Sequence, residues 1–366
     1  MQKDFDRKLI LDDGDTYYGY SFGAIKDCVT EIVFNTSMVG YQEILSDPSY
    51  MYQTVVMSYP LIGNYGITRD NFESERPVLG GLVVKEYNDI PSNFRSVRTL
   101  SEAMEDYNIP GISGVDTRKL IRSIRNFGSR RCLITSPDTT TEQALEIIKN
   151  TPIPRDAVQR VTTKRIQRYA ARGTMSIVAI DCGMKLNIVR TFNNKGVSVT
   201  VVPYGTTADE IIKLNPDGVF ISNGPGDPED AELAIETIKN LIGKFPMFGI
   251  CLGHQIIAKA YGASTYKLKF GHRGGNHPVK NLATGKIEVT SQNHSYAVDL
   301  ESMKNTRLKP THINLLDNTV EGAECVEDKV MSVQYHPESA PGPEDSTYLF
   351  DKFIEMIKEN KNSKQC

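Results

Sequence analysis

A cysteine between two glycines carries the strongest chemical signal in this sequence. The stretch Phe-Gly-Ile-Cys-Leu-Gly-His-Gln places Cys251 between Gly249 and Gly253, after an apolar run and at the start of a helical pattern. Glycines flank a nucleophile at a sharp strand-to-helix turn because the turn leaves no room for side chains. The positive end of a helix dipole favours the thiolate, which is the nucleophilic form. Cys251 is therefore predicted to be a nucleophile, and the N–H of Leu252 is a candidate donor to an oxyanion.

A thiol nucleophile needs a base, and His336 is the best placed histidine. It follows an apolar run and opens a His-Pro-Glu stretch, so Glu338 can turn back and orient the imidazole. Cys251, His336 and Glu338 thus form a predicted catalytic triad. His254 is expected to point along its helix, away from the thiol. The other histidines are interpreted as surface or hydrogen-bonded loop residues: His272, His277, His294 and His312.

Two other loops follow predicted strands. The stretch Ser-Asn-Gly-Pro-Gly-Asp-Pro contains Gly224 and Gly226, which expose backbone N–H groups, and prolines that fix the turn. Beside the cysteine turn it is a candidate second wall of an oxyanion and substrate pocket. Cys182 also ends a strand but lacks a preceding glycine, so we interpret it as a core or turn residue.

The elements around these residues predict an α/β protein with two domains. Residues 1–150 mix short strands with helices at 117–125 and 141–150, which indicates a smaller α+β domain. Residues 175–366 alternate strands and helices, which predicts a mainly parallel sheet with helices on both faces. Residues 151–174 are basic, with little apolar periodicity, and are interpreted as a linker, or alternatively as a contact strip for a partner.

Composition narrows the class of protein. The net charge of −3 gives no bulk electrostatic reason to bind nucleic acid or an anionic membrane. The N-terminus is charged and no long apolar stretch occurs, so neither secretion nor membrane insertion is expected. The six cysteines form no C-x-x-C pair and no cluster at zinc-ligand spacing. We therefore expect a cytoplasmic protein with reduced thiols and no metal.

Three motifs together carry a family resemblance. Gly-Ile-Cys-Leu-Gly-His-Gln, Ser-Asn-Gly-Pro-Gly-Asp-Pro and His-Pro-Glu, in that order, resemble the class I (triad) glutamine amidotransferases. Further segments resemble the small subunit of carbamoyl phosphate synthase, including a first domain that other amidotransferases lack: residues 33–50, 58–66, 269–280 and 341–345. The resemblance implies hydrolysis of L-glutamine to ammonia through a glutamyl thioester, with Cys251, His336 and Glu338 as the triad.

The same resemblance implies a set of glutamine-binding residues. They are Ser49, Gly224, Gly226, Leu252, Gln255, Asn293, Ser295 and Tyr296. One of them departs from the family pattern, because Ser295 stands where the family usually has glycine. If that glycine serves a backbone angle that serine tolerates poorly, the pocket is expected to be slightly altered.

The sequence has no G-x-x-x-x-G-K-[ST] loop, so no cofactor is expected in this chain. The resemblance places ATP and Mg²⁺ on a separate large synthetase subunit, which makes carbamoyl phosphate for arginine biosynthesis, pyrimidine biosynthesis or both. That large chain is the expected partner. Two alternatives remain, another class I amidotransferase of an anthranilate or guanylate synthesis system, and an inactive regulatory scaffold. The first-domain motifs oppose the former and the intact triad opposes the latter.

Overall fold

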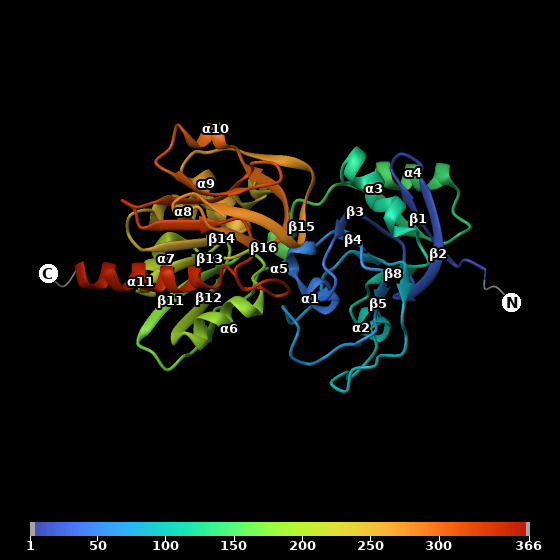
Figure 1. Ribbon diagram of the computed structural model, residues 1–366, viewed down its shortest axis with the longest axis horizontal. Helices are drawn as coiled ribbons and strands as arrows, with labels where there is room; N and C mark the ends of the chain where they lie inside the picture. Colours follow the sequence, from blue (N-terminus) through green and yellow to red (C-terminus); the bar gives the residue numbers. More distant parts are fainter. Residues whose placement is uncertain (1–3, 364–366) are drawn as a thin grey trace. The chain divides into compact units, whose positions relative to one another are not determined.

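A computed structural model describes residues 4–363 of the chain. It contains two compact units, one ending at Pro154 and the other starting at Arg155, and Figure 1 shows their helices and strands. None of the helices within the described residues has the length and apolar character needed to cross a membrane.

The first unit is built on a closed β-barrel. Its strands are β1 (Arg7–Leu11), β2 (Thr16–Gly23), β3 (Cys28–Asn35), β4 (Gln53–Met57), β6 (Gly81–Val83), β8 (Pro110–Ser113) and β9 (Arg130–Thr135). They follow one another in the order β1-β2-β8-β6-β4-β3-β9, and β1 pairs with β9 to close the ring. The neighbours from β3 through β4 and β6 to β8 are parallel, and the other pairs are antiparallel. The mixture of helices and strands in this unit was predicted from the sequence. The closure of its strands into a barrel was not.

Short elements and helices surround the barrel. They are α1 (Tyr41–Ser46), a 3-10 helix η1 (Pro48–Tyr50), β5 (Leu61–Ile62), β7 (Glu86–Tyr87), α2 (Leu100–Asp106), α3 (Thr117–Phe127) and α4 (Thr141–Asn150). Capping explains where α4 begins, because Thr140 and Gln143 form a reciprocal capping box. Ala144 and Ile148 of α4 then pack on the barrel residues Ile10 and Leu133. The helices predicted at 117–125 and 141–150 are confirmed.

The second unit contains a ten-stranded sheet. Its strands are β10 (Gln167–Tyr169), β11 (Met175–Asp181), β12 (Val197–Pro203), β13 (Gly218–Ile221), β14 (Met247–Ile250), β15 (Thr265–Asn281), β16 (Ile287–Val298), β17 (Lys309–Asn314), β18 (Val320–Cys325) and β19 (Val330–Val333). Their order is β10-β12-β11-β13-β14-β19-β18-β17-β15-β16. The pairs from β12 to β19 are parallel, as predicted. The remaining pairs are antiparallel: β10 lies beside β12 at one edge, and β18, β17, β15 and β16 form an extension beyond β19 at the other, which the sequence pattern did not reveal.

Helices cover both faces of this sheet, as predicted (Figure 1). They are α5 (Ala157–Val161), α6 (Leu186–Asn194), α7 (Ala208–Lys213), a 3-10 helix η2 (Pro228–Ala231), α8 (Glu232–Leu241), α9 (Leu252–Ala260), α10 (Leu300–Met303) and α11 (Tyr348–Ser363). Strand β11 shows how the two cores arise: Val178 and Ile180 pack with α7, α8 and α9, whereas Ile177 and Ala179 pack with α6 and α11. Alternate residues of a strand face opposite sides of its sheet.

The segment expected to be a linker, residues 151–174, includes two short elements of the second unit. It contains α5 and β10, and β10 pairs antiparallel with β12. Val158 of α5 is buried in a core of the second unit. The sequence analysis missed the strand because a short edge strand is held by backbone hydrogen bonds, which leave little trace in the pattern of apolar side chains.

Candidate active site

Cys251 occupies the sharp turn between β14 and α9. Its backbone has φ 55° and ψ −104°, a conformation that costs a non-glycine residue strain energy. Close packing explains the flanking glycines. A Cβ atom on Gly253 would lie 2.2 Å from the carbonyl oxygen of Ile221, and one on Gly249 would lie 2.7 Å from the carbonyl oxygen of Gly253. The glycines therefore let α9 begin directly against the sheet, with the cysteine on the turn.

The thiol of Cys251 is buried, with 2% of the residue exposed. Its backbone N–H donates to the carbonyl oxygen of Val333 over 2.9 Å, which ties the turn to β19. Its Sγ atom lies 3.5 Å from the carbonyl oxygen of Asn293 on β16. Elements on both sides of the turn thus fix the position of the sulfur.

His336 and Glu338 lie in the loop after β19. The backbone N–H of His336 donates to the carbonyl oxygen of Ser291, and its Nδ1 atom lies 2.7 Å from Oε1 of Glu338. Both side chains are buried. The other ring nitrogen, Nε2, has no nitrogen or oxygen partner among residues 4–363. It is the atom available to a thiol or to a substrate.

The charges around His336 favour its protonated form. Burial lowers the pKa of His336, as does Lys185, but Glu338 and Cys251 outweigh both and the pKa rises to about 9. Burial raises the pKa of Glu338, but Lys185 and His336 lower it to about 2. At neutral pH the pair is therefore an imidazolium and a carboxylate.

Lys185 contacts this buried pair, and the sequence analysis missed it. Its Nζ atom lies 3.0 Å from Oε1 of Glu338, and only 3% of the lysine side chain is exposed. Nζ also donates to the carbonyl oxygen of Ala340 over 3.1 Å. One signal in the sequence could have indicated Lys185: it lies directly before α6 and soon after the parallel strand β11. Loops at the carboxyl ends of parallel strands commonly bind ligands.

Several predicted glutamine-binding residues lie around the cysteine turn. A Cβ atom on Gly224 would lie 2.9 Å from Cδ2 of Leu252, so the backbone of the Gly224 loop packs closely on the turn. On α9, Nε2 of Gln255 donates to the carbonyl oxygen of Tyr296 over 2.8 Å, which joins the helix to β16. The loop after β13, the start of α9 and the middle of β16 therefore surround one thiol.

Family models match both units of the chain. Residues 9–134 match the carbamoyl-phosphate synthase small chain, CPSase domain, and residues 178–356 match glutamine amidotransferase class-I. The carbamoyl phosphate synthase small chain of Staphylococcus epidermidis is 54% identical over 360 residues, which cover 98% of each chain. This chain belongs to the carbamoyl phosphate synthase small chain family.

Other members of the carbamoyl phosphate synthase small chain family match this chain over a similar length. The protein from Fusobacterium nucleatum is 53% identical over 97% of this chain and 99% of its own. The pyrimidine-specific small chain of Bacillus subtilis is 52% identical over 96% of each. Among solved structures, a glutamine amidotransferase from Thermotoga maritima covers 51% of this chain and 85% of its own, at 18% identity and a TM-score of 0.37. The match over the first unit decides against the alternative amidotransferase systems.

The serine that departs from the carbamoyl phosphate synthase small chain pattern fits without backbone strain. Ser295 is not among the residues with positive φ, so no glycine-like angle is required there. Its hydroxyl accepts a hydrogen bond from Arg273, a neighbour across the β15–β16 pair. The expected alteration of the pocket through strain is therefore not found.

Two other residues implied by the carbamoyl phosphate synthase family stay predictions. Ser49 lies in η1 of the first unit, where its N–H donates to Asp47 over 2.9 Å. Gly226 has φ 90°, in the region that favours glycine, and the nearest atom to an added Cβ is that of Ala157 in α5, at 3.4 Å. Gly226 therefore lies against the segment that was expected to be a linker.

The interpretation of four histidines as surface or loop residues was wrong. His272, His277, His294 and His312 lie on strands of the antiparallel extension, and all but the partly exposed His277 are buried. The sequence analysis did not predict the antiparallel extension. It therefore gave no reason to expect these histidines on buried strands. His254 is buried as well, with Nδ1 2.8 Å from Oγ of Ser332.

The cysteines are free thiols wherever the structure describes them. Burial raises the pKa of Cys182 far above its usual range, which agrees with its interpretation as a core residue. Cys366 lies outside the described residues.

Proposed function

We propose that this chain hydrolyses the side-chain amide of L-glutamine and supplies the ammonia to a large subunit of carbamoyl phosphate synthase. One arrangement carries the proposal: a cysteine on a strained strand-to-helix turn, next to a buried pair of His336 and Glu338 whose charges depend partly on that cysteine. A nucleophile, a base and an orienting carboxylate are the parts that thiol-dependent amide hydrolysis needs.

The first half of the proposed reaction releases ammonia. The sulfur of Cys251 attacks the carbonyl carbon of the glutamine side chain as a thiolate, and the N–H of Leu252 stabilises the oxyanion together with the Gly224 loop. The imidazolium of His336 gives its proton to the amide nitrogen. The carbon–nitrogen bond then breaks, ammonia leaves, and a glutamyl thioester remains on Cys251.

The second half regenerates the thiol. His336, now neutral, takes a proton from water while the water oxygen attacks the thioester carbonyl. The carbon–sulfur bond breaks, glutamate leaves, and the thiolate and imidazolium are restored. Glu338 orients the imidazole throughout, and Lys185 keeps that carboxylate ionised.

We assign glutamine binding first to residues of the second unit that lie around this centre. Gln255 and Tyr296 are already joined by a hydrogen bond, and the carbonyl of Asn293 lies against the sulfur. The remaining assignments follow the family alone: Ser49, Gly226 and Ser295.

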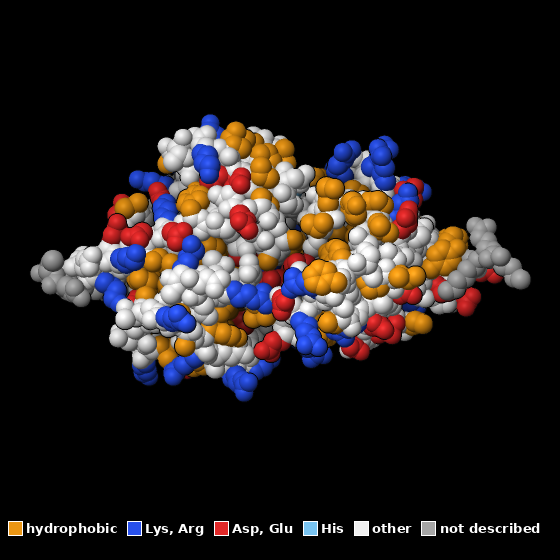
Figure 2. Space-filling model, turned by 60° about the horizontal axis from the view of Figure 1, so that its bottom comes forward, with side chains coloured by type: hydrophobic (Ala, Val, Ile, Leu, Met, Phe, Trp, Pro, Cys, Tyr) orange, Lys and Arg blue, Asp and Glu red, His pale blue; other side chains and the backbone are white. Residues whose placement is uncertain are grey.

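The released ammonia must be received before it diffuses away, so a stable partner is part of the proposal. We assign ATP, Mg²⁺ and the bicarbonate-dependent steps to the large subunit, and place the complex in the cytoplasm. Support for a partner-binding surface comes from large hydrophobic side chains exposed on the first unit, namely Ile90, Phe94 and Phe127. Figure 2 shows hydrophobic side chains gathered on the surface in the right half of that view.

Substitution of the nucleophile tests the proposal. Cys251→Ser, assembled with the large subunit, is expected to abolish glutamine-dependent synthesis of carbamoyl phosphate and to leave ammonia-dependent synthesis intact. Both rates are measured on the same preparation, so the ammonia-dependent rate reports whether the complex is folded and assembled. Loss of both activities, or of neither, contradicts the assignment.

A further inference from the structure

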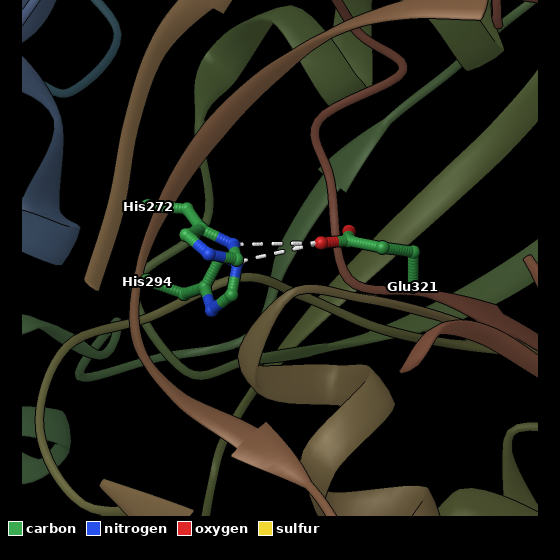
Figure 3. A group of neighbouring side chains, drawn as sticks. All are labelled: His272, His294 and Glu321. Carbon is green, nitrogen blue, oxygen red and sulfur yellow. Dashed lines mark ion pairs between the residues drawn. The ribbon is translucent and has the colours of Figure 1, made fainter. Parts of the chain in front are cut away.

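Two histidines and a glutamate from three strands meet inside the second unit (Figure 3). His272 belongs to β15, His294 to β16 and Glu321 to β18. Each offers one ligand atom, and these atoms all lie within 4.8 Å of one another. The residues are 6%, 5% and 0% exposed. None of them has a part in the proposed hydrolysis.

The two imidazole rings face the same carboxylate oxygen. Nδ1 of His272 lies 3.6 Å from Oε1 of Glu321, and Nε2 of His294 lies 4.0 Å from it. Figure 3 shows both rings turned toward the carboxylate. Both separations are longer than a good hydrogen bond, and the other group near Nδ1 of His272 is the side-chain amide nitrogen of Asn314, at 3.5 Å.

The opposite nitrogen of each ring is held by another group. Nε2 of His272 lies 2.8 Å from Asp317, and Nδ1 of His294 lies 2.7 Å from the carbonyl oxygen of Tyr296. A carbonyl oxygen can only accept, so Nδ1 of His294 carries the hydrogen and Nε2 presents a lone pair. Such outer hydrogen bonds orient histidines that bind metals.

The lone pair of His294 has no partner among the described residues. Nε2 is buried and forms no hydrogen bond there. A buried polar atom without a partner is costly, so it indicates an unfilled ligand position. Oε1 of Glu321 accepts from Asn314 over 3.0 Å, and Oε2 accepts from Gln292 over 2.9 Å. These bonds fix the carboxylate and still leave a second lone pair on Oε1.

We propose that the cluster binds a zinc ion through Nδ1 of His272, Nε2 of His294 and Oε1 of Glu321. Two imidazoles and a carboxylate, with water in a fourth position, are a ligand set that Zn²⁺ accepts. Zinc bonds of about 2.0–2.2 Å require ligand atoms about 3.3–3.5 Å apart, so zinc binding would draw the side chains inward from separations of up to 4.8 Å. Asp317, which contacts the opposite nitrogen of His272, is partly exposed at the edge of the cluster.

Zinc at this place would join three strands of the antiparallel extension. His294 directly follows Asn293, whose carbonyl oxygen contacts the sulfur of Cys251. The ion would therefore hold the strand that borders the thiol. The alternative cation is a proton on His272, which would pair with Asp317 and Glu321 without any metal.

Zinc binding to the full-length chain tests the proposal. The purified protein is stripped with a chelator, dialysed against zinc and analysed for bound metal, and its thermal unfolding is recorded with and without zinc. Wild type is expected to bind one zinc ion per chain and to unfold at a higher temperature when loaded. Glu321→Gln is expected to lower the affinity by at least about tenfold, because it removes the only anionic ligand.

His312→Gln is the matched control, since His312 is a buried strand histidine outside the three-residue cluster. It is expected to bind zinc as wild type does. If Glu321→Gln does not fold, His294→Gln replaces it with the same expected loss. Substoichiometric zinc on wild type, or wild-type affinity in the folded cluster variant, overturns the proposal and leaves the proton on His272 as the counter-ion of Glu321.

Discussion

The Nζ atom of Lys185 lies 3.0 Å from Oε1 of Glu338, and both side chains are almost fully buried. Removal of one partner from a buried ion pair leaves an uncompensated charge, which typically costs about 3–5 kcal/mol. Lys185→Met is therefore expected to reduce the free energy of unfolding by about that amount, as measured by urea denaturation. It is also expected to slow glutaminase turnover, because the ionised form of Glu338 loses its cation.

A second lysine on the same unit provides the control. Lys195 pairs with Asp351 over 2.7 Å at the surface, where the side chains are 27% and 60% exposed. Exposed ion pairs contribute at most about 1 kcal/mol, so Lys195→Met is expected to cost little and to keep full activity. Equal losses in the two variants would show that burial does not set the contribution of Lys185.

Proton transfer by His336 predicts an order of kinetic effects. His336→Asn is expected to slow formation and breakdown of the thioester by about 10²-fold or more, because a general acid and base is lost. Glu338→Gln is expected to slow them less, since Glu338 orients the imidazole without transferring the proton. Single-turnover kinetics on variants with intact thermal unfolding separate the two steps. A larger effect of Glu338→Gln would reverse the assigned roles.

The raised pKa of His336 predicts a pH-dependent contribution to stability. Its folded-state pKa is about 9, above the ordinary value of 6.5, so the protonated residue stabilises the folded protein fully below pH 6.5. That contribution is lost as the pH rises from 6.5 through 9. The difference in the free energy of unfolding between wild type and His336→Asn is thus expected to be largest below pH 6.5 and to shrink toward pH 9. A difference that stays constant over this range contradicts the assignment.

The turn that carries Cys251 predicts a steric effect of a single methyl group. Gly253→Ala places a Cβ atom 2.2 Å from a backbone carbonyl oxygen, which cannot rotate away. We expect a loss of stability of about 1–3 kcal/mol and a large fall in glutaminase activity as α9 shifts. Gly275→Ala is the control, because its nearest neighbour would be Pro343 at 3.7 Å, an ordinary contact distance. Thermal unfolding and turnover of the two variants are compared.

The parallel part of the second unit could be read from the sequence, because its strands are short apolar runs followed by helical periodicity. The turn at Cys251 was also predictable, since the flanking glycines report a steric requirement. Lys185 was not found, because its burial depends on a tertiary pairing with Glu338, far away in the chain. The cluster of His272, His294 and Glu321 was invisible for a related reason. Its members come from three strands of an antiparallel extension whose polar interior hides the usual apolar signal.

The closed ring of the first unit has a consequence for how that unit opens. Its earliest strand in the chain, β1, pairs with its last, β9, through contacts such as Leu9 with Ile134. Each terminal strand therefore has two neighbours, and the barrel has no free edge from which fraying could begin. Backbone amides of β1 and β9 should exchange with solvent deuterium as slowly as those of β4 and β6, because all of them are released only when the ring opens as a whole.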